Sequence, residues 1–222
     1  MLGQLANYLR RRHMKVLKPF ANSVAEGLRL SLGDCDSEKA AALANAFAGA
    51  EEVEVVEGNL LDLTCDAIVS PANSFGDMGG GIDKAIDDFH QGAAQRAVMA
   101  AIAAEYFGEL PVGAALIVKL PAKRFPYIIA APTMRIPGSV IGSINAYLAM
   151  RAALTAVLRH NANASQPIRT IAIPGLCTGV GGMPCDVASQ QMRTAFDNIL
   201  RGGWQKVYHL AQAPYALKFE RL

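Results

Sequence analysis

The chain has 222 residues, of which 52% are hydrophobic and 18% charged, with a formal net charge of +2. This composition predicts a packed core, excludes wholesale disorder, and gives no electrostatic reason to expect nucleic-acid binding. The four cysteines form no CxxC pair and only four histidines are present, so neither a zinc site nor a disulfide framework is expected, and no apolar run is as long as a membrane span.

Residues 1–27 are interpreted as an N-terminal extension. Apolar residues at 2, 5, 8 and 9 predict a short amphipathic helix that ends in Arg10-Arg11-Arg12. This basic end is interpreted as a solvated helix terminus and not as a contact with nucleic acid or membrane. Because the segment lacks the charge-then-apolar order of a signal peptide, a cytoplasmic protein is expected.

From residue 28 onward, strand and helix patterns alternate. Residues 28–32 alternate as a strand, and Asp36 or Ser37 is expected to cap a helix over residues 38–47. Further strands are expected at 53–56, 67–69, 112–120, 127–131, 170–173 and 207–210. Further helices are expected at 91–107, 144–159 and 186–200, with one more that begins at Ile82; Asp186 is expected to cap the helix at 186–200. The alternation predicts an α/β sandwich in one domain over residues 28–222.

Two glycine-rich loops each follow a buried strand and precede a helix. The first runs from Pro71 through Gly79-Gly80-Gly81, and the second spans residues 174–184, PGLCTGVGGMP. In an open α/β sheet such loops meet beyond the carboxyl ends of the strands. Glycines let a ligand approach the backbone, and a helix N-terminus offers N–H donors to phosphate. Neither loop is a GxGxxG or P-loop motif, yet together they predict a phosphate or ribose site.

Four segments taken in order are more specific: EGNLLDL (57–63), DAIVSPANS (66–74), GGGIDKAI (79–86) and CTGVGGMP (177–184). Their order and spacing resemble the macro domain family of ADP-ribose-binding modules, and the SPANSFG then GGGID form resembles a subgroup found in bacterial and phage-associated genes. The resemblance covers about residues 28–212. It implies a three-layer α/β/α sandwich with a mixed central sheet, and a cleft for ADP-ribose or an ADP-ribosyl derivative between the two loops.

The resemblance also implies roles for individual residues. Asn73 would contact the distal ribose, and Asp83 would position or activate a water at the anomeric carbon, so these are the candidate catalytic residues. The N–H groups of the second loop would wrap the diphosphate, as in a backbone anion nest. The implied substrate-binding residues are Asn59, Asn73, Ser74, Phe75, Gly79, Gly80, Gly81, Ile82, Cys177, Thr178, Gly179, Val180, Gly181, Gly182 and Met183. No metal and no cofactor is expected.

The sequence departs from the family pattern at three positions. Asn59 replaces the aspartate at the adenine; its amide oxygen still accepts a hydrogen bond, and Asp34 or Asp62 is a candidate to supply the missing charge. Gly181 replaces an aromatic residue, for which Phe75 is the candidate substitute. Lys84 replaces a small residue beside Asp83. These departures favour retained binding more than retained catalysis.

Three classes of function therefore stand beside one another. The first is a hydrolase that releases ADP-ribose from proteins or acetate from O-acetyl-ADP-ribose. The second is a non-catalytic reader of ADP-ribose, free or on a protein, in which Asp83 only stabilises a helix start. The third is a methyltransferase-like protein, suggested by the acidic turn after residues 28–32 but lacking the preceding glycine-rich turn. Cys177 is interpreted as a small buried thiol and not as a nucleophile.

Overall fold

The computed structural model describes residues 14–18 and 27–206, so the predicted helix near the N-terminus and the predicted strand at 207–210 lie outside the described residues. The strands are β1 Lys15–Lys18, β2 Arg29–Asp34, β3 Val53–Glu57, β4 Ala67–Ser70, β5 Leu116–Lys119, β6 Tyr127–Ala130 and β7 Thr170–Pro174. The α-helices are α2 Ser37–Ala46, α3 Gly81–Phe89, α4 Ala93–Tyr106, α5 Asn145–Asn163 and α6 Cys185–Leu200, with short 3₁₀ helices η2 Leu60–Asp62 and η3 Gly203–Lys206.

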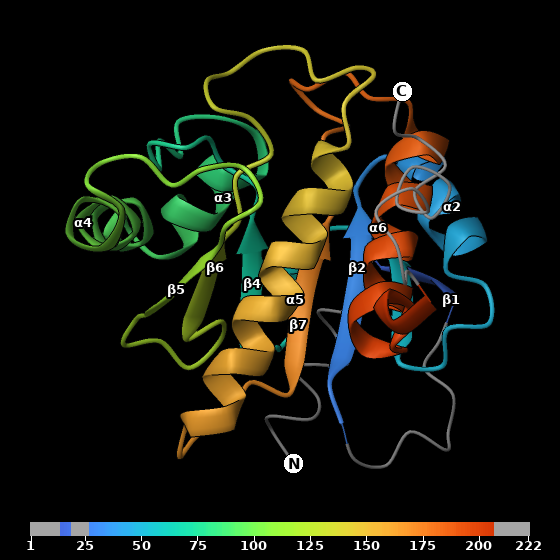
Figure 1. The fold of residues 1–222 in the computed structure, drawn as a ribbon, viewed down its shortest axis with the longest axis horizontal. Coiled ribbons are helices and arrows are strands. Elements are labelled where there is room, and N and C mark those ends of the chain that lie inside the picture. Colours follow the sequence, from blue (N-terminus) through green and yellow to red (C-terminus); the bar gives the residue numbers. More distant parts are fainter. Residues whose placement is uncertain (1–13, 19–26, 207–222) are drawn as a thin grey trace.

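The strands form one seven-stranded mixed sheet in the order β1-β3-β2-β7-β4-β6-β5 (Figure 1). The pairs β2–β3, β2–β7, β4–β7 and β4–β6 are parallel, and only the edge pairs β1–β3 and β5–β6 are antiparallel. The parallel centre follows from the alternation of strands and helices, because a parallel neighbour needs a crossover connection. The predicted α/β class with a mixed sheet is confirmed.

Helices cover both faces of this sheet and make the three layers. Helices α2, α5 and α6 pack on one face, in a core that includes Phe47, Leu154 and Phe196. Helices α3 and α4 pack on the other face with Ile86 and Val98. Successive residues of the central strands alternate between the two cores, which explains why those strands are continuously apolar in sequence.

Several predicted elements differ from the observed ones. The strand predicted at 112–120 begins only at Leu116, because residues 112–115 include a turn with Gly113 at φ +94°. Helix α5 continues to Asn163 instead of ending at 159, and the Asn161 side chain then bonds both backbone groups of Ile168 (2.7 and 2.8 Å). The predicted capping role of Asp186 is wrong: α6 begins at Cys185 and has no side-chain cap. Asp186 lies in the first turn of α6, where its negative charge interacts favourably with the positive end of the helix dipole.

The segment before residue 28 also contributes to the sheet. Strand β1, which was not predicted, pairs with β3 at the edge, and Lys15 lies opposite Glu57. Residues 15–18 of the predicted extension are thus hydrogen-bonded to the sheet of the domain. The domain boundary between residues 27 and 28 stays a prediction.

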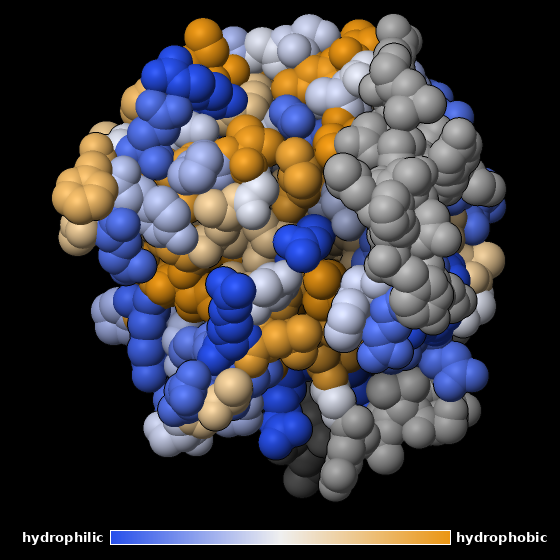
Figure 2. Space-filling model, viewed as in Figure 1, coloured by the Kyte–Doolittle hydropathy of each residue, from blue (hydrophilic) through white to orange (hydrophobic). Residues whose placement is uncertain are grey.

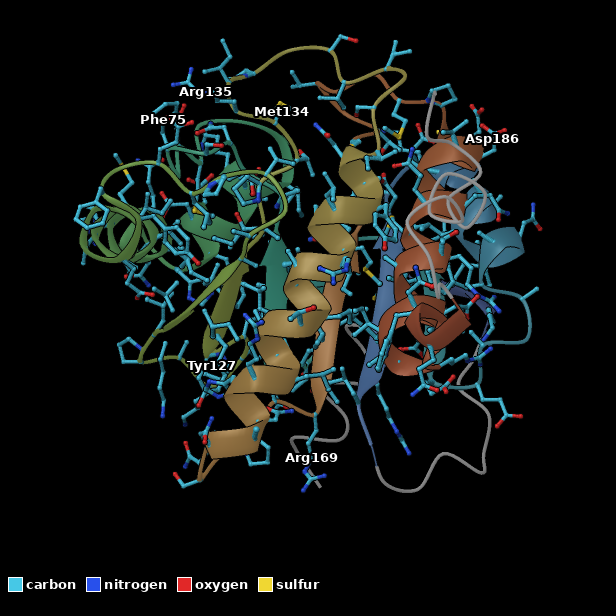
Figure 3. The ribbon with its side chains drawn as sticks, viewed as in Figure 1. Phe75, Tyr127, Met134, Arg135, Arg169 and Asp186 are labelled. Atoms are coloured by element: carbon cyan, nitrogen blue, oxygen red, sulfur yellow. The ribbon has the colours of Figure 1, made fainter. Side chains whose placement is uncertain are left out.

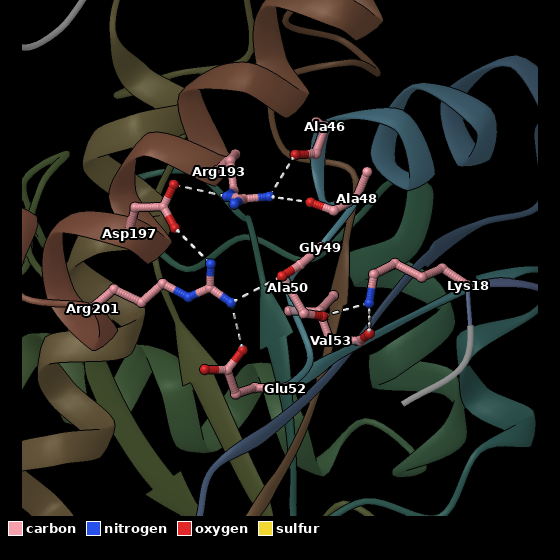
Figure 4. A network of polar contacts seen from close by, with 10 residues as sticks. All are labelled: Lys18, Ala46, Ala48, Gly49, Ala50, Glu52, Val53, Arg193, Asp197 and Arg201. Carbon is pink, nitrogen blue, oxygen red and sulfur yellow. Dashed lines mark hydrogen bonds and ion pairs between the residues drawn. The ribbon is translucent and has the colours of Figure 1, made fainter. Parts of the chain in front are cut away.

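A network of hydrogen bonds and ion pairs connects α6 to the segment between α2 and β3 (Figure 4). The Arg193 guanidinium donates to the carbonyls of Ala46 (2.9 Å) and Ala48 (3.0 Å) and to the Asp197 carboxylate (2.8 Å). Arg201 adds a contact to Glu52 at 3.0 Å. Because the Arg193 side chain is only 19% exposed, its partners would be left partly desolvated without it.

We expect Arg193→Ala to lower the free energy of unfolding by about 2–3 kcal/mol, since two carbonyls and a carboxylate lose their shared donor. Urea denaturation monitored by circular dichroism measures this loss. Arg151→Ala, on the exposed side of α5, is the matched control and should change stability by no more than about 0.5 kcal/mol. An equal effect of the two substitutions would contradict a fastening role for Arg193.

Candidate functional site

A cavity of about 600 Å³ opens where the parallel strands end, at the upper edge of the sheet in Figure 1. Most of the lining lies at the carboxyl ends of five strands or in the loops that follow them: 33–35 at the end of β2, 58–60 after β3, 71–73 after β4, Thr133, Met134 and Pro137 after β6, and Pro174, Gly175 and 177–181 at the end of β7 and beyond it. The start of α3 closes one side. The size lies within the roughly 300–1,000 Å³ typical of small-ligand sites.

The structure brings most of the sequence-predicted site residues together in this cavity. Those that line it are Asn59, Asn73, Gly79, Gly80, Gly81, Ile82, Asp83, Cys177, Thr178, Gly179, Val180 and Gly181. Four others lie outside the cavity lining: Ser74, Phe75, Gly182 and Met183. Segments more than 100 residues apart in the chain thus meet at one edge of the sheet.

The four residues outside the lining have other surroundings. Met183 is 2% exposed in the core, and Ser74 is buried with no hydrogen-bond partner for its hydroxyl within the described residues. The ring of Phe75 lies 5.3 Å from the Arg135 guanidinium, and Figure 3 shows the two side chains together beside Met134. Phe75 therefore packs on the outer surface, and the ring expected to replace the family aromatic is not at the cavity.

Asn73 holds the first loop in shape. Its Oδ1 accepts from the backbone N–H of Phe75 (3.0 Å) and of Asp77 (3.3 Å), and its Nδ2 donates to the Asp77 carbonyl (3.1 Å). The amide oxygen is thus used within the loop, while the amide group carries a second N–H. Asn73 can serve a ligand through that N–H and through the loop conformation it maintains.

The three consecutive glycines lead the chain into α3. Gly80 is extended at φ −146° and Gly81 takes a left-handed φ of +56°, which a residue with a side chain adopts only with strain. The first helical hydrogen bond runs from the Lys84 N–H to the Gly80 carbonyl (3.1 Å). The N–H groups before it have no acceptor within the helix. The glycines thus place the start of α3 at the cavity wall.

The second loop is a tight turn with unused donors. Its ends are closed by hydrogen bonds from Met183 N–H to the Cys177 carbonyl and from Gly182 N–H to the Gly179 carbonyl, both 3.0 Å. Across the described ranges, no hydrogen bond uses the N–H groups of residues 178–181. Several unpaired backbone N–H groups around one turn form an anion-binding nest. The turn is therefore suited to a phosphate or diphosphate group.

Asp83 is the most perturbed carboxyl group of the cavity. Its Oδ1 accepts from the Ser70 hydroxyl at 2.6 Å, and the backbone N–H of Ala72 also bonds the carboxylate. Burial raises the pKa of Asp83 to about 6, with a smaller contribution from the nearby Asp77, although both hydrogen bonds lower it. A carboxyl group that titrates near neutral pH is suited to accept or donate a proton during a reaction.

The structure favours the buried-thiol interpretation of Cys177. Burial raises the pKa of its thiol to about 12, and a hydrogen bond with Thr133 offsets this only in part. A thiol with this pKa is protonated at neutral pH, whereas a nucleophile needs the thiolate. Cys177 nevertheless takes a left-handed φ of +66°, so it shapes the start of the second loop.

Two positions that depart from the family pattern, Lys84 and Asn59, have defined partners in the structure. Lys84 forms an exposed ion pair with Asp88 one turn further along α3, with 2.5 Å between Nζ and Oδ2. The positive charge of Lys84 is therefore paired with Asp88. Asn59 is exposed and caps η2: its Oδ1 accepts from the Leu61 N–H at 3.0 Å. Of the two candidate carboxylates, Asp34 lines the cavity and Asp62 does not.

Sequence reasoning missed several residues that line the cavity, among them Asp77, Lys39 and the 133–137 segment. The last comes shortly after the strand predicted at 127–131. Its position after a predicted central strand was the available signal, because that places it at the same edge as the glycine loops. Asp77 carries no motif of its own, and its charge raises the pKa of Asp83 only because the fold brings the two carboxyl groups close together.

Exposed apolar side chains flank the opening of the cavity. Val180, which lines it, is 71% exposed, and Ile136 beside the lining residue Pro137 is 59% exposed. Ile141 lies 3.6 Å from the position that a Cβ on Gly182 would take. Figure 2 shows apolar side chains at the upper edge that carries these loops. The rim offers contact area to an apolar part of a ligand or of the molecule that carries it.

Two features are absent from residues 14–18 and 27–206. No group of three or more His, Cys, Asp or Glu side chains in these ranges could hold a metal ion. No helix in the same ranges combines the length and the apolar character needed to cross a membrane.

Fold and site together define an α/β/α sandwich protein with a ligand cavity between two glycine-rich loops at the carboxyl edge of its sheet. Residues 69–192 match the Macro domain family, and the chain belongs to that family. This assignment confirms the resemblance seen in the sequence and replaces the methyltransferase-like alternative.

Relatives of this chain have been found by sequence and by structure. It is 32% identical over 146 residues to an uncharacterised protein of Aquifex aeolicus, covering 64% of this chain and 78% of that protein. It is 36% identical over 164 residues to an uncharacterised protein of Aeropyrum pernix, covering 71% and 77%. The Oceanobacillus iheyensis macrodomain with MES bound superposes with a TM-score of 0.52 at 25% identity, covering 64% of this chain and 74% of that one.

Proposed function

We propose that this macro domain binds ADP-ribose, free or attached to a protein, in the cavity between its two glycine-rich loops. The observation that carries the proposal is the set of unpaired N–H groups of residues 178–181 at the cavity wall. They offer several backbone donors to a diphosphate without requiring basic side chains, which accords with a net charge of only +2. Membership of the macro domain family and the motifs that resemble ADP-ribose-binding modules support the same ligand.

A second function, hydrolysis of the ADP-ribosyl linkage, is favoured by one specific observation. Asp83 lines the cavity and has a pKa of about 6, raised by burial. Positive charge develops at the anomeric carbon when a glycosidic bond breaks, and a carboxylate beside it both stabilises that charge and accepts a proton from the attacking water. The released group would be a protein side chain. With O-acetyl-ADP-ribose the bond broken would instead be the acetate ester of the ribose, and Asp83 would accept a proton from the water that attacks the acyl carbon, releasing acetate and ADP-ribose.

Calorimetric titration with ADP-ribose tests the binding proposal. We expect a dissociation constant in the micromolar range, about 10⁻⁶ to 10⁻⁴ M, and no heat with S-adenosylmethionine. Gly80→Val should abolish binding without lowering the melting temperature, because a Cβ on Gly80 meets no protein atom within 4 Å. Gly138→Val, in the exposed loop outside the cavity lining, is the matched control and should bind as the wild type does.

Turnover separates the hydrolase from the reader. Wild-type protein incubated with a mono-ADP-ribosylated protein should release ADP-ribose, and release of acetate from O-acetyl-ADP-ribose is measured in parallel. Binding without release from either substrate would exclude the hydrolase and support a non-catalytic ADP-ribose-binding protein. Absence of ADP-ribose binding up to about 1 mM would overturn the proposal as a whole.

A further inference from the structure

The two ends of the cavity differ in the strands that build them. The unpaired N–H groups follow β7, in the middle of the sheet. Asp83 belongs to the helix after β4, on one side of β7, whereas Asp34 ends β2 and Asn59 follows β3, both on the other side. A ligand with a sugar on either side of a diphosphate would therefore place one sugar near Asp83 and its nucleoside near the ends of β2 and β3.

Among the described residues at the nucleoside end, Asp34 offers a whole carboxylate oxygen that accepts no hydrogen bond, whereas the Asn59 oxygen has only one of its two lone pairs left. The Asn59 oxygen is already bonded to the Leu61 N–H that it caps, and Asp62 does not line the cavity. Asp34 does line it, and only its Oδ1 is used, as acceptor from the Asp36 N–H at 3.0 Å. The second oxygen, Oδ2, has no hydrogen bond within the described residues.

Two local features hold the Asp34 carboxylate at the cavity wall. The Asp34 carbonyl accepts from the Gly58 N–H at 2.9 Å, which ties the end of β2 to the loop after β3. On the other side, Oδ2 lies 3.3 Å from the position that a Cβ on Gly175 would take. Because Gly175 has no side chain, the start of the loop after β7 leaves space beside this oxygen.

We propose that Asp34, and not Asn59, is the residue by which this site recognises the nucleoside of its ligand, by accepting a hydrogen bond from a nucleoside donor. This inference rests on the proposed binding of ADP-ribose. An ionised carboxylate accepts more strongly than an amide, so it replaces the charge that is absent at position 59. Two donors fit the chemistry: the exocyclic amino group of adenine and a hydroxyl of the adjoining ribose.

Calorimetry on the full chain tests the proposal with ADP-ribose and with its hypoxanthine analogue, which lacks the amino group. We expect Asp34→Asn to weaken ADP-ribose binding by about tenfold or more, because the charge-assisted bond is lost. If the donor is the amino group, wild-type protein prefers ADP-ribose and Asp34→Asn loses that preference. If the donor is a ribose hydroxyl, Asp34→Asn weakens both ligands equally; either result supports Asp34.

Two matched controls change a carboxylate to an amide close by. Asp62→Asn and Asp36→Asn should bind ADP-ribose within about twofold of wild type, since neither residue lines the cavity. Melting temperatures verify that every variant is folded; asparagine at position 34 still offers an oxygen to the Asp36 N–H. An affinity of Asp34→Asn within about twofold of wild type would overturn the inference alone, whereas a wild type that binds no ADP-ribose would overturn the proposed function as well.

Discussion

Replacing Gly181 by alanine is expected to weaken ADP-ribose binding and to destabilise the protein. A Cβ at this position would lie 2.6 Å from the Cys177 carbonyl oxygen and 2.8 Å from a methyl group of Val140. Neither can give way cheaply, since Cys177 takes part in closing the turn and Val140 is bonded through its N–H to the Gly181 carbonyl. The backbone of the second loop must therefore move.

We expect Gly181→Ala to lower the free energy of unfolding by about 1–3 kcal/mol, as overpacking does, and the affinity for ADP-ribose by at least about tenfold. The affinity falls because displaced N–H groups no longer converge on one anion. Urea denaturation and calorimetry measure the two effects separately. The loss of stability is a property of the protein alone and does not depend on the identity of the ligand.

The matched control for stability lies two residues away. A Cβ on Gly179 meets no protein atom within 4 Å, so Gly179→Ala should keep the stability of the wild type within about 0.5 kcal/mol. Equal stability of Gly181→Ala and the wild type would show that the loop is not packed as described. The same contacts explain the departure from the family pattern: no ring fits at position 181 while Cys177 and Val140 hold these positions.

Asp83→Asn is expected to stop turnover and, at the same time, to stabilise the protein. At about pH 7.5 the wild-type carboxylate is ionised in a buried position, whereas asparagine carries no charge and still offers an oxygen to the Ser70 hydroxyl. A pKa of about 6 instead of 3.8 corresponds to a gain on the order of 2–3 kcal/mol in the free energy of unfolding. Chemical denaturation of the two proteins measures the difference.

The pH dependence has a definite sign. The folded protein protonates Asp83 near pH 6 and the unfolded chain near 3.8, so between these values the folded state binds more protons. The contribution of Asp83 to stability therefore decreases as the pH rises through this window and is constant above it. The stability difference between Asp83→Asn and wild type should vanish below about pH 4 and be complete above about pH 7. Turnover should rise around pH 6, where Asp83 of the folded protein loses its proton.

Asp88→Asn is the control on the same helix. Asp88 is exposed and pairs with Lys84, and an exposed pair is worth about 0–1 kcal/mol, so this variant should show no stabilisation. If Asp83→Asn proved less stable than the wild type, Asp83 would be an ordinary helix-start acid and its catalytic role would be abandoned. A gain in stability with loss of turnover is the pattern of a residue kept for its function at a cost to the fold.

The glycine loops, their order and the strands before them were predictable from the sequence because their signals are local. Three consecutive glycines before a helix start, and a PGLCTG turn after the apolar run 170–173, indicate loops through the residues of those segments themselves. Continuous apolar strands in alternation with helices likewise required a parallel sheet covered on both faces. The family resemblance and the predicted α/β/α layers follow from these local signals, and both are confirmed.

Tertiary structure alone decided which side chains line the cavity and which neighbours surround them. The order β3-β2-β7-β4 sets Asp34 on one side of the second loop and Asp83 on the other, which no spacing in the sequence reveals. The pKa of Asp83 depends on burial beside Ser70 and Asp77, and the ring of Phe75 is held against Arg135 outside the cavity. Burial, hydrogen-bond partners and electrostatic neighbours come from segments far apart in the chain, and they exist only once those segments are packed together.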